Sequence, residues 1–592
     1  MLSKFSNEEI ARLLRQVAAA YSVKGFNYFR IIAYDKAAET VEKSNIDIKD
    51  LWDENRLVDL PGIGKSIAEY LSQLFKTGHV RHFEEVFKGL PKGMFPLLDV
   101  SGFGPKKAYK ISKQFKLYNP QTVVSSLLKI AKSGKIARLP GFGKKSEQDI
   151  IEALERFRQG QAKQKRMPLP YAFATAKLIL EYLKKNPLTV KAYPLGSLRR
   201  MVSTIGDIDI AVATKEPKKV IDWFLKYPKT NKIIEVGTSG ATIYLNTGQQ
   251  IDLRVQSPQS FGAMLQYFTG SKAHNIHLRE YALKRGMSLS EYGIKKINAR
   301  KSIKTYASEE EFYKAVGLPW IPPELREDRG EIEAAQKNYL PDLVGRSHIR
   351  GEVHVHSNYN LEPSHDLGSS SLTELLKVAS LMNYEYLGIS DHNPSISKHT
   401  ENGIIDILKK RKYKFEQILL SNKNVRVKLF IMLEVDILPD GQLALPEKAF
   451  NYLDAIIVSV HSSFFLTKEA MTKRILKGLS HPKAKILGHP TGRLIGSREA
   501  YDADWRAIFD FCRLKNKALE INAYPDRLDL NDYMVKRAIE NHNKLIINTD
   551  SHQKEQLSLI NYGISVARRG WATKNDILNT LSYQEFKKWL TG

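Results

Sequence analysis

Three aspartates on two segments with strand periodicity constrain the fold of this chain most strongly. Residues 205–212 and 250–255 alternate apolar and polar side chains, which predicts two β-strands with apolar faces toward a core. Side chains two apart on a strand share a face, so Asp207 and Asp209 converge, and Asp252 can join them from the second strand. Three carboxylates on one sheet face repel one another unless divalent cations neutralise them.

A short loop before the first strand has residues that bind phosphate. Gly196 lets an anion approach the backbone, Ser197 offers a hydroxyl group, and Arg200 offers a planar guanidinium that pairs with phosphate oxygens. Two magnesium ions about 3.5–4 Å apart would stabilise the attacking and leaving oxygens of a nucleotidyl transfer. A solvated strand face is the simpler interpretation of the paired aspartates alone, but the loop and the distant third aspartate argue against it.

These motifs resemble those of the family X DNA polymerases, to which DNA polymerase beta belongs. The likeness continues through Tyr267 to Ser271 and the helically spaced pair that follows. The resemblance implies that Asp207, Asp209 and Asp252 hold Mg²⁺ or Mn²⁺, with Asp252 as general base for the primer 3′-hydroxyl. It further implies that the incoming nucleotide is bound by Gly196, Ser197, Arg200, Arg254, Tyr267, Phe268, Gly270, Ser271 and Asn275, and that Arg279 contacts the DNA template.

A glycine-containing turn recurs at 60–65, 100–106 and 139–144, each time before a helix-like segment. In a helix-hairpin-helix element the glycines allow a tight turn that exposes amide groups at the next helix N-terminus to a DNA phosphate. Such contacts hold DNA without reading its sequence. The predicted DNA-binding residues are Gly62, Gly64, Lys65, Gly102, Gly104, Lys106, Gly141, Gly143 and Lys144, with a monovalent cation as a further candidate ligand of these elements.

Positive charge is concentrated where these turns lie. The chain has a net charge of +27, and residues 101–200 hold 22 Lys and Arg against five Asp and Glu. So basic a surface favours a polyanion such as DNA, although the lysines of 161–166 are equally typical of a solvated linker.

A second cluster of metal-ligand types begins at His354 and His356, which strand spacing places on one face. The other members each follow an apolar, strand-like run, as at Asp391. Chemistry at the carboxyl ends of alternating strands is typical of a barrel, and mixed nitrogen and oxygen ligands suit Mn²⁺ or Zn²⁺. The remaining candidate ligands are His392, Glu434, His461, His489, Asp550 and His552.

This part of the chain resembles the PHP (polymerase and histidinol phosphatase) domain of bacterial and archaeal family X polymerases. The resemblance implies a distorted barrel that hydrolyses phosphoesters at DNA 3′ ends, as an exonuclease and phosphatase, and in some members cuts at abasic sites. Two positions depart from the family pattern: Glu352 replaces an Asp, and Leu361 occupies a position where the family has an Asp ligand. Glu362, His365 or Asp366 could take over that role.

The amino-terminal domain also departs from its relatives. In DNA polymerase beta a lysine of the first hairpin helix forms a Schiff base with the 5′-deoxyribose phosphate, and the aligned residue here is Tyr70. A phenol cannot form that imine, so we expect no efficient lyase by this route. Lys36 and Lys65 remain candidates for binding the 5′-phosphate.

A chain of 592 residues needs several cores. We expect a multidomain α+β and α/β protein: a helix-hairpin-helix domain at 1–85, fingers at 90–165, a nucleotidyltransferase palm with a mixed sheet at 166–262, a small thumb at 263–325, a linker at 326–345, and a (β/α)7-type PHP barrel at 346–592. The lone Cys512, the absence of an 18-residue apolar run and the polar amino terminus predict a protein of a reducing cytoplasm with no membrane span or signal peptide. The resemblance to bacterial and archaeal polymerases implies a prokaryotic, nucleoid-associated setting, and we expect a monomer.

The favoured function is a template-directed polymerase that fills short gaps in base excision repair and processes 3′ ends through the PHP domain. A 3′-end hydrolase whose polymerase half only binds DNA, a polymerase with an inactive PHP domain, a scaffold with both sites idle and a template-independent nucleotidyltransferase are the alternatives. Asn275, Arg279 and the three hairpins favour a templated duplex.

Overall fold

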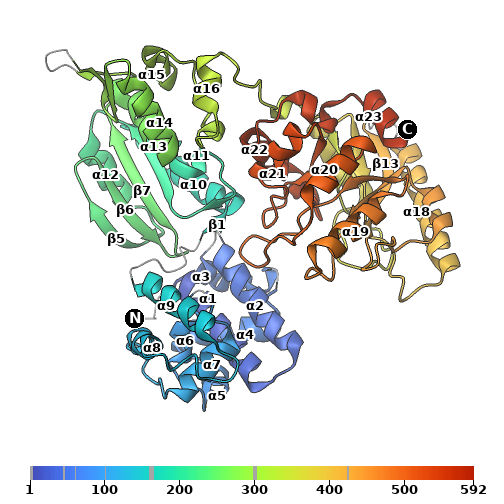
Figure 1. Cartoon of the computed structure of the whole chain (residues 1–592), viewed down its shortest axis with the longest axis horizontal. Coiled ribbons are helices and arrows are strands. Elements are labelled where there is room, and N and C mark those ends of the chain that lie inside the picture. The colour runs from blue at the N-terminus through green and yellow to red at the C-terminus, as the bar shows by residue number, and fades with distance from the viewer. Residues whose placement is uncertain are drawn as a thin grey trace. The chain divides into compact units, whose positions relative to one another are not determined.

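The computed structural model describes residues 5–44, 47–60, 62–100, 102–158, 166–297, 303–422 and 426–592 (Figure 1). Of the predicted linker at 161–166, only Arg166 lies within these residues. The chain divides into two compact units, one comprising Met1–Met167, Ala174–Ala192 and Gly206–Val255, and the other Pro168–Phe173, Tyr193–Ile205 and Gln256–Gly592. No helix in the described part is long and apolar enough to cross a membrane.

The amino-terminal part is helical and has two apolar cores. The first surrounds Leu71 and Phe75, and the second surrounds Ile111 and Leu127. Both contain helices that follow a glycine turn, so the turns are fixed from within by buried side chains. The helices are α1 (Asn7–Lys24), α2 (Tyr28–Lys43), α3 (Ile48–Asp53), α4 (Lys65–Thr77), α5 (Arg81–Phe87), α6 (Met94–Leu97), α7 (Pro105–Gln114), α8 (Val123–Lys132) and α9 (Lys144–Arg158).

A five-stranded sheet with the order β2-β4-β7-β6-β5 carries the predicted aspartates. The strands expected at 205–212 and 250–255 correspond to β4 and β7, and β6 pairs antiparallel with both β5 and β7. The alternate residues Ile208, Ile210 and Ile251 are buried, as the period of two predicts. The elements of this region are β1 (Met167–Pro168), α10 (Leu169–Lys184), β2 (Lys191–Pro194), α11 (Gly196–Arg199), β3 (Thr204–Ile205), β4 (Ile208–Ala213), α12 (Pro217–Leu225), β5 (Thr230–Val236), β6 (Gly240–Leu245) and β7 (Gln250–Gln256).

The next region packs helices against a small antiparallel sheet and contains a buried ion network. Glu309 is 3% exposed and receives hydrogen bonds from the guanidinium groups of Arg199 and Arg326. Burial alone would raise the pKa of Glu309, but the two arginines lower it to about 2. The elements are α13 (Phe261–Thr269), α14 (Lys272–Leu283), β8 (Met287–Ser290), β9 (Gly293–Lys296), β10 (Ile303–Lys304), α15 (Glu309–Val316) and α16 (Glu331–Gln336).

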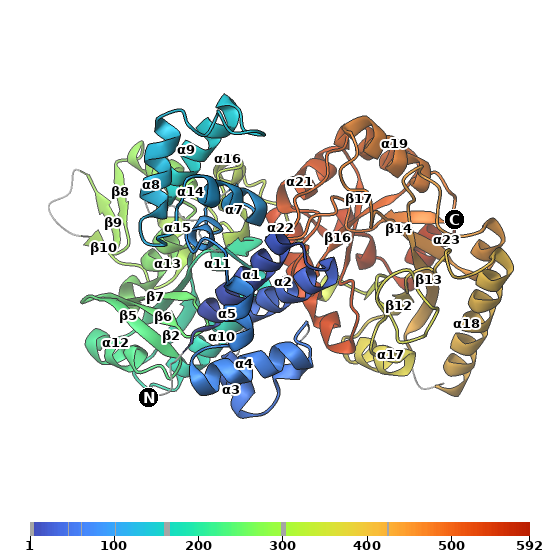
Figure 2. The same ribbon diagram turned by 90° about the horizontal axis from the view of Figure 1, so that it is seen from below.

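The carboxy-terminal domain is a nearly closed barrel of seven parallel strands in sequential order, surrounded by helices (Figure 2). A parallel bridge between Val355 and Ser551 joins the extensions of the first and last strands. The predicted seven-stranded PHP-type barrel is therefore confirmed. Its elements are β11 (Gly351–Glu352), α17 (Leu372–Leu381), β12 (Tyr386–Ile389), α18 (Glu401–Ser421), β13 (Lys428–Asp436), β14 (Ala455–Ser459), α19 (Lys468–Leu479), β15 (Ala484–Leu487), α20 (Trp505–Leu514), β16 (Ala518–Asn522), α21 (Asp532–Glu540), β17 (Lys544–Asn548), α22 (Ile560–Arg569) and α23 (Tyr583–Thr591).

The Glu309 network gives a stability prediction. Glu309→Gln leaves two buried guanidinium groups short of a counter-charge and should lower the free energy of unfolding of this region by about 3 kcal/mol at pH 7. Because the folded pKa lies below the ordinary value of 4.5, the stabilisation is present above pH 4.5 and is lost as the pH falls toward 2. Native-state hydrogen exchange of residues 306–335 measures it, with Glu310→Gln on the exposed side of the same helix as control. Equal protection of both variants at pH 7 would contradict the prediction.

Candidate functional site

The three predicted aspartates lie together at the sheet. Asp207 immediately precedes β4, Asp209 lies on β4, Asp252 lies on β7, and oxygens of all three carboxylates lie within 4.8 Å of one another. Thr242 is opposite Asp252 in the register of β6 and β7, and its hydroxyl donates to Oδ1, while the Gln250 amide donates to Oδ2 at 2.8 Å. Two neutral donors thus orient Asp252 without cancelling its charge, and three carboxylates are a donor set that fits Mg²⁺.

The phosphate-type loop belongs to the second unit. Gly196 opens α11 with a φ of 55°, a backbone conformation that glycine adopts without strain, and Ser197 follows it. The Arg200 guanidinium already has two partners: Nε donates to Glu327 at 2.9 Å, and Nη1 donates to the Thr269 carbonyl oxygen. The arginine is therefore held in place and must share these acceptors with any phosphate that it binds.

The aromatic pair ends one helix just before another begins. Tyr267 and Phe268 lie in the last turn of α13, with ring centroids 5.1 Å apart in an edge-to-face arrangement. Gly270 has a φ of 67°, and the Ser271 hydroxyl caps α14 by accepting from the His274 amide. The turn between the helices is thus built from the residues that the sequence motif singled out.

The predicted polar pair, Asn275 and Arg279, lies on α14, after the turn that joins it to α13. The Asn275 amide donates to the Tyr267 carbonyl oxygen at 2.6 Å and accepts from Gln266 at 2.9 Å. Arg279 donates to the Asn275 carbonyl oxygen from the next turn of the helix. Arg254 lies on β7, on the exposed side of the strand.

The three glycine turns have a common backbone conformation. The first glycines, Gly62, Gly102 and Gly141, have φ values of 84°, 79° and 84°. The second glycines, Gly64 and Gly104, are extended and cap α4 and α7, neither of which has an acidic side chain in its first turn. The helix N-termini therefore offer amide groups to an anion without a competing carboxylate. Of the remaining predicted residues, Lys65 and Lys144 begin α4 and α9, Lys106 is the second residue of α7, and Gly143 immediately precedes α9.

Tyr70 has a packing role in the first hairpin domain. Its ring stacks on His82 with centroids 4.7 Å apart and meets Phe83 edge to face. Lys36 lies next to the turn, where a Cβ at Gly62 would come within 3.3 Å of the lysine Cβ. The aromatic stack leaves the expectation against an imine-forming lyase in place, and it puts Lys36 beside the first candidate phosphate site.

Glu434 is the centre of the barrel cluster. Its Oε2 lies 3.2 Å from Nε2 of His354 and 3.1 Å from Nδ1 of His392. Its Oε1 lies 2.8 Å from Nε2 of His489 and 3.3 Å from Nε2 of His461. One carboxylate on β13 thus gathers histidines from four other strand ends, as the barrel topology predicts.

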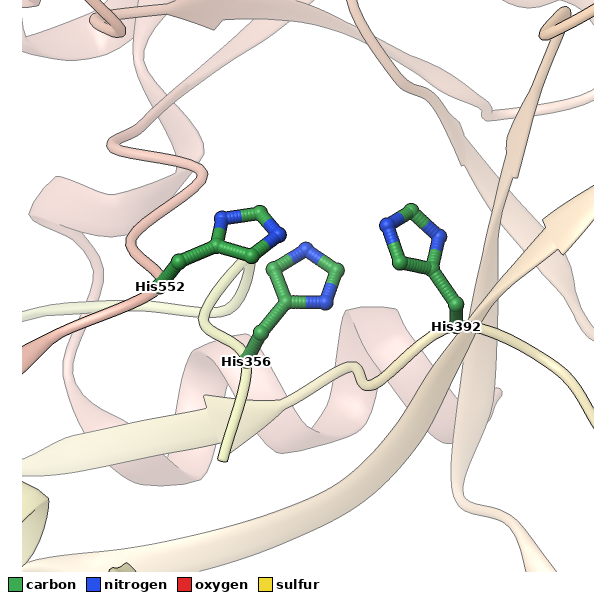
Figure 3. A group of neighbouring side chains, drawn as sticks. All are labelled: His356, His392 and His552. Atoms are coloured by element: carbon green, nitrogen blue, oxygen red, sulfur yellow. The ribbon is translucent and has the colours of Figure 1, made fainter. Parts of the chain in front are cut away.

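The other candidate ligands complete the cluster. Figure 3 shows the imidazoles of His356, His392 and His552 turned toward one another, and the ring centroids of His356 and His552 are 4.2 Å apart. Asp550 approaches His356 Nε2 to 3.2 Å. All eight residues predicted from the sequence therefore converge on the carboxyl ends of the strands.

A loop near Leu361 brings a carboxylate close to the cluster. Leu361 is buried and apolar, and cannot coordinate a metal. Asp366, five residues later, lies 3.4 Å from Nε2 of His392 and 3.5 Å from Nε2 of His552. Of the three substitutes that the sequence left open, Asp366 is the one that reaches the histidines of Figure 3.

The other two substitutes have different partners. Glu362 lies 3.5 Å from His399. His365 lies 3.1 Å from an oxygen of Asp436, at the edge of the cluster. Asp366 therefore approaches the cluster beside His392 and His552, whereas His365 lies together with Asp436 and His461 in a group whose ligand-type atoms are within 4.8 Å of one another.

Two carboxylates that orient the histidines escaped the sequence analysis. Glu520 on β16 bonds Nδ1 of His354 at 2.7 Å and accepts from the His489 amide at 2.6 Å. Asp436 bonds Nδ1 of His461 at 2.6 Å. Burial alone would lower the pKa of His461, but Glu434 and Asp436 raise it to about 9. Such outer carboxylates fix the ring orientation and the tautomer of a ligand. The sequence signal that could have identified Glu520 is a single acidic residue within the apolar, strand-like segment 518–522.

The donor atoms of the cluster fit a metal centre. Several buried ligand-type atoms lie close to one another yet form no hydrogen bond of acceptable geometry among the described residues, and buried polar atoms are rarely left so. These atoms are Nε2 of His354, both ring nitrogens of His356, Nδ1 of His392, Oε2 of Glu434 and Nε2 of His552.

Two neighbouring acids form hydrogen bonds within the barrel. Asp391, a candidate ligand by its place before His392, accepts from the buried Arg411 and from Ser357. Glu352 accepts from the amide and hydroxyl of Thr549 and so ties β11 to β17. Burial raises the pKa of Glu352 to about 8.

Known proteins match the chain along its length. The DNA polymerase/3′-5′ exonuclease PolX of Bacillus subtilis is 33% identical over 588 residues, covering 98% of this chain and 99% of the relative. DNA polymerase lambda of Rattus norvegicus is 24% identical over 350 residues, or 54% and 56% of the two chains. A probable phosphatase of Clostridium acetobutylicum is 29% identical over 196 residues, or 31% and 72%.

Family models match four segments. They are a helix-hairpin-helix domain at 5–80, a SAM-like helix-hairpin-helix tandem at 95–156, a DNA polymerase beta thumb at 264–327 and a PHP domain at 352–524. With a likeness to PolX sustained over almost its whole length, the chain belongs to the family X DNA polymerases that carry a carboxy-terminal PHP domain.

Proposed function

We propose that this chain is a template-directed DNA polymerase that fills short gaps in base excision repair and that its barrel processes DNA 3′ ends. The convergence of Asp207, Asp209 and Asp252 in a chain of this family carries the proposal. The eight-residue barrel cluster supports the hydrolytic activity, as a 3′-5′ exonuclease, a 3′-phosphatase or an abasic-site endonuclease.

In the polymerase half the three aspartates hold Mg²⁺ or Mn²⁺, which neutralises charge at the transferred phosphate when it is bound. Asp252, oriented by Thr242 and Gln250, accepts the proton of the primer 3′-hydroxyl. Arg279 contacts the template. The nucleotide is bound by Gly196, Ser197, Arg200, Arg254, Tyr267, Phe268, Gly270, Ser271 and Asn275.

In the barrel the eight predicted ligands, with Asp366 as a ninth, hold Mn²⁺ or Zn²⁺, the ions that mixed imidazole and carboxylate donors suit. When bound, the metal supplies Lewis acidity at the phosphate. Glu520 and Asp436 keep the imidazoles oriented toward it.

The proposal extends to organisation. The domain boundaries predicted from the sequence are retained, with the hairpin turns gripping gapped DNA and binding a monovalent cation. We propose that the protein is a monomer that acts on DNA in the prokaryotic cytoplasm and nucleoid. Its similarity to a bacterial PolX supports this location.

Asp252→Asn tests the general base. The amide keeps the shape and can still accept the hydrogen bond from Thr242 on β6, but it loses the second acceptor oxygen and cannot take up the proton. Incorporation on a one-nucleotide gapped duplex should therefore fall by on the order of 10³-fold. The affinity for the duplex should remain within a factor of two of that of the unmodified chain in a fluorescence anisotropy titration. Retained incorporation would remove the assignment and favour the hydrolase alternative.

Asp366→Ala tests the replacement ligand. We expect bound Mn²⁺ or Zn²⁺, measured by mass spectrometry after gel filtration, to fall, with nucleotide release from a 3′ end reduced by about 10–100-fold. Glu362→Ala, in the same loop but directed to His399, is the matched control. A metal content equal in both variants would show that Asp366 is no ligand.

The helix-hairpin-helix turns predict how the affinity for DNA depends on salt concentration. Replacing Lys65 or Lys106 by Ala should weaken binding equally on unrelated DNA sequences and reduce the slope of log affinity against log salt by about 0.9 if one phosphate contact is lost. Lys76→Ala, exposed at the other end of α4, is the control. Anisotropy titrations between 50 and 200 mM salt measure the slope, and identical slopes would contradict a phosphate contact.

A further inference from the structure

An arginine of the barrel domain reaches the phosphate-type loop of the polymerase half. Arg569 lies at the end of α22 and is 4% exposed. Its Nη1 donates to the main-chain carbonyl oxygen of Arg200 at 2.6 Å and to Oε1 of Glu327 at 2.9 Å. The same Glu327 oxygen accepts from Nε of Arg200. Arg569 therefore touches both the backbone of Arg200 and the carboxylate that holds its side chain.

The other end of Arg569 is anchored inside the barrel domain. Nη2 donates to Asp532 at 2.8 Å, at the start of α21, and Arg329 donates to the same oxygen at 3.0 Å. Burial alone would raise the pKa of Asp532, but Arg569 and Arg329 lower it. The acceptor of Arg569 thus stays ionised at neutral pH, and its guanidinium has one orientation.

The charges of this group leave Arg200 able to attract an anion. Three guanidinium groups, those of Arg200, Arg329 and Arg569, face two carboxylates, Glu327 and Asp532, so the group carries a net charge of +1. Without Arg569 the net charge is zero, and Glu327 has Arg200 as its remaining partner in the group. A carboxylate shared by two guanidiniums binds each more weakly than one devoted to a single guanidinium, because their charges compete for it.

We propose that Arg569 of the barrel domain is a positioning residue for nucleotide binding by the polymerase half. Arg569 fixes the main-chain carbonyl group of Arg200 and competes with the Arg200 side chain for Glu327. The Arg200 guanidinium is therefore paired less strongly and can bind the triphosphate. The proposal rests on the nucleotide-binding role proposed for Arg200. It makes the affinity of the polymerase for dNTP depend on a side chain of the hydrolytic domain.

The experiment is steady-state incorporation on a one-nucleotide gapped duplex with the full-length chain. Arg569→Ala should raise the KM for dNTP about tenfold with kcat changed less than threefold, the pattern expected when an interaction common to ground and transition states is lost. Arg569→Lys should recover little of the affinity, because one ammonium cannot reproduce the geometry of a forked guanidinium. Release of nucleotides by the barrel should stay within a factor of two for both variants.

Arg568→Ala is the matched control. Arg568 is the preceding residue of α22 and also pairs with the polymerase half, at Glu324 and the Val344 carbonyl oxygen, but it does not contact Arg200. We expect its KM to change less than twofold. An equal rise in both variants would mean that the contact between the domains acts only as structural support, and would overturn the proposal.

Two further variants separate the possible failures. If Arg200→Ala leaves the KM unchanged, the nucleotide-binding role of Arg200 is wrong; if it raises the KM while Arg569→Ala does not, the positioning role is wrong. In a Glu327→Gln background the effect of Arg569→Ala should shrink to below threefold, because the carboxylate it competes for is gone. A full tenfold effect in that background would also overturn the proposal. Should Arg569→Ala fail to fold, Glu327→Gln alone decides, and a KM that does not fall would contradict the competition.

Discussion

Buried arginines, each paired with hydrogen-bond acceptors, organise the interior of this protein. Arg326, Arg411 and Arg474 are the largest fully buried side chains among the residues that the structure describes. Arg326 pairs with Glu309, Arg411 pairs with Asp391, and Arg474 donates to main-chain carbonyl oxygens at the ends of β13 and β14. An unpaired buried charge costs several kcal/mol, so each guanidinium fixes the position of its acceptors. The strand ends that carry the barrel ligands are held by two of these arginines.

Local periodicity predicted most of the architecture and of both clusters. The period of two was sufficient to place Asp207 and Asp209 together, because side chains two residues apart on an extended segment point to the same face whatever surrounds them. Strand-end histidines were predictable in the same way. Asp366 was left open among three residues, since the course of an irregular loop depends on what it packs against. Glu520 was missed because nothing in its neighbourhood tells a strand glutamate that binds a histidine from one that binds water.

The two clusters divide metal chemistry between them by donor type. The palm offers three carboxylates, hard ligands that suit Mg²⁺, whereas the barrel surrounds Glu434 with imidazoles that suit Mn²⁺ or Zn²⁺. With the ions proposed above, the synthetic and the hydrolytic site of one chain would hold different metals. The contacts of Arg569 add a physical link, because they join the hydrolytic domain to the loop proposed above to bind the nucleotide.

The closing bridge of the barrel has a consequence for synthesis of the protein on the ribosome. Val355 pairs with Ser551, and the cluster draws His354 from the first strand and Asp550 from the extension of the last. A nascent chain that has not yet reached residue 550 lacks both the bridge and two of the ligands. The polymerase aspartates have all been translated long before that point. The three polymerase aspartates are thus translated before the last residues of the hydrolytic cluster, whereas Arg569, proposed above to position Arg200, is translated after them.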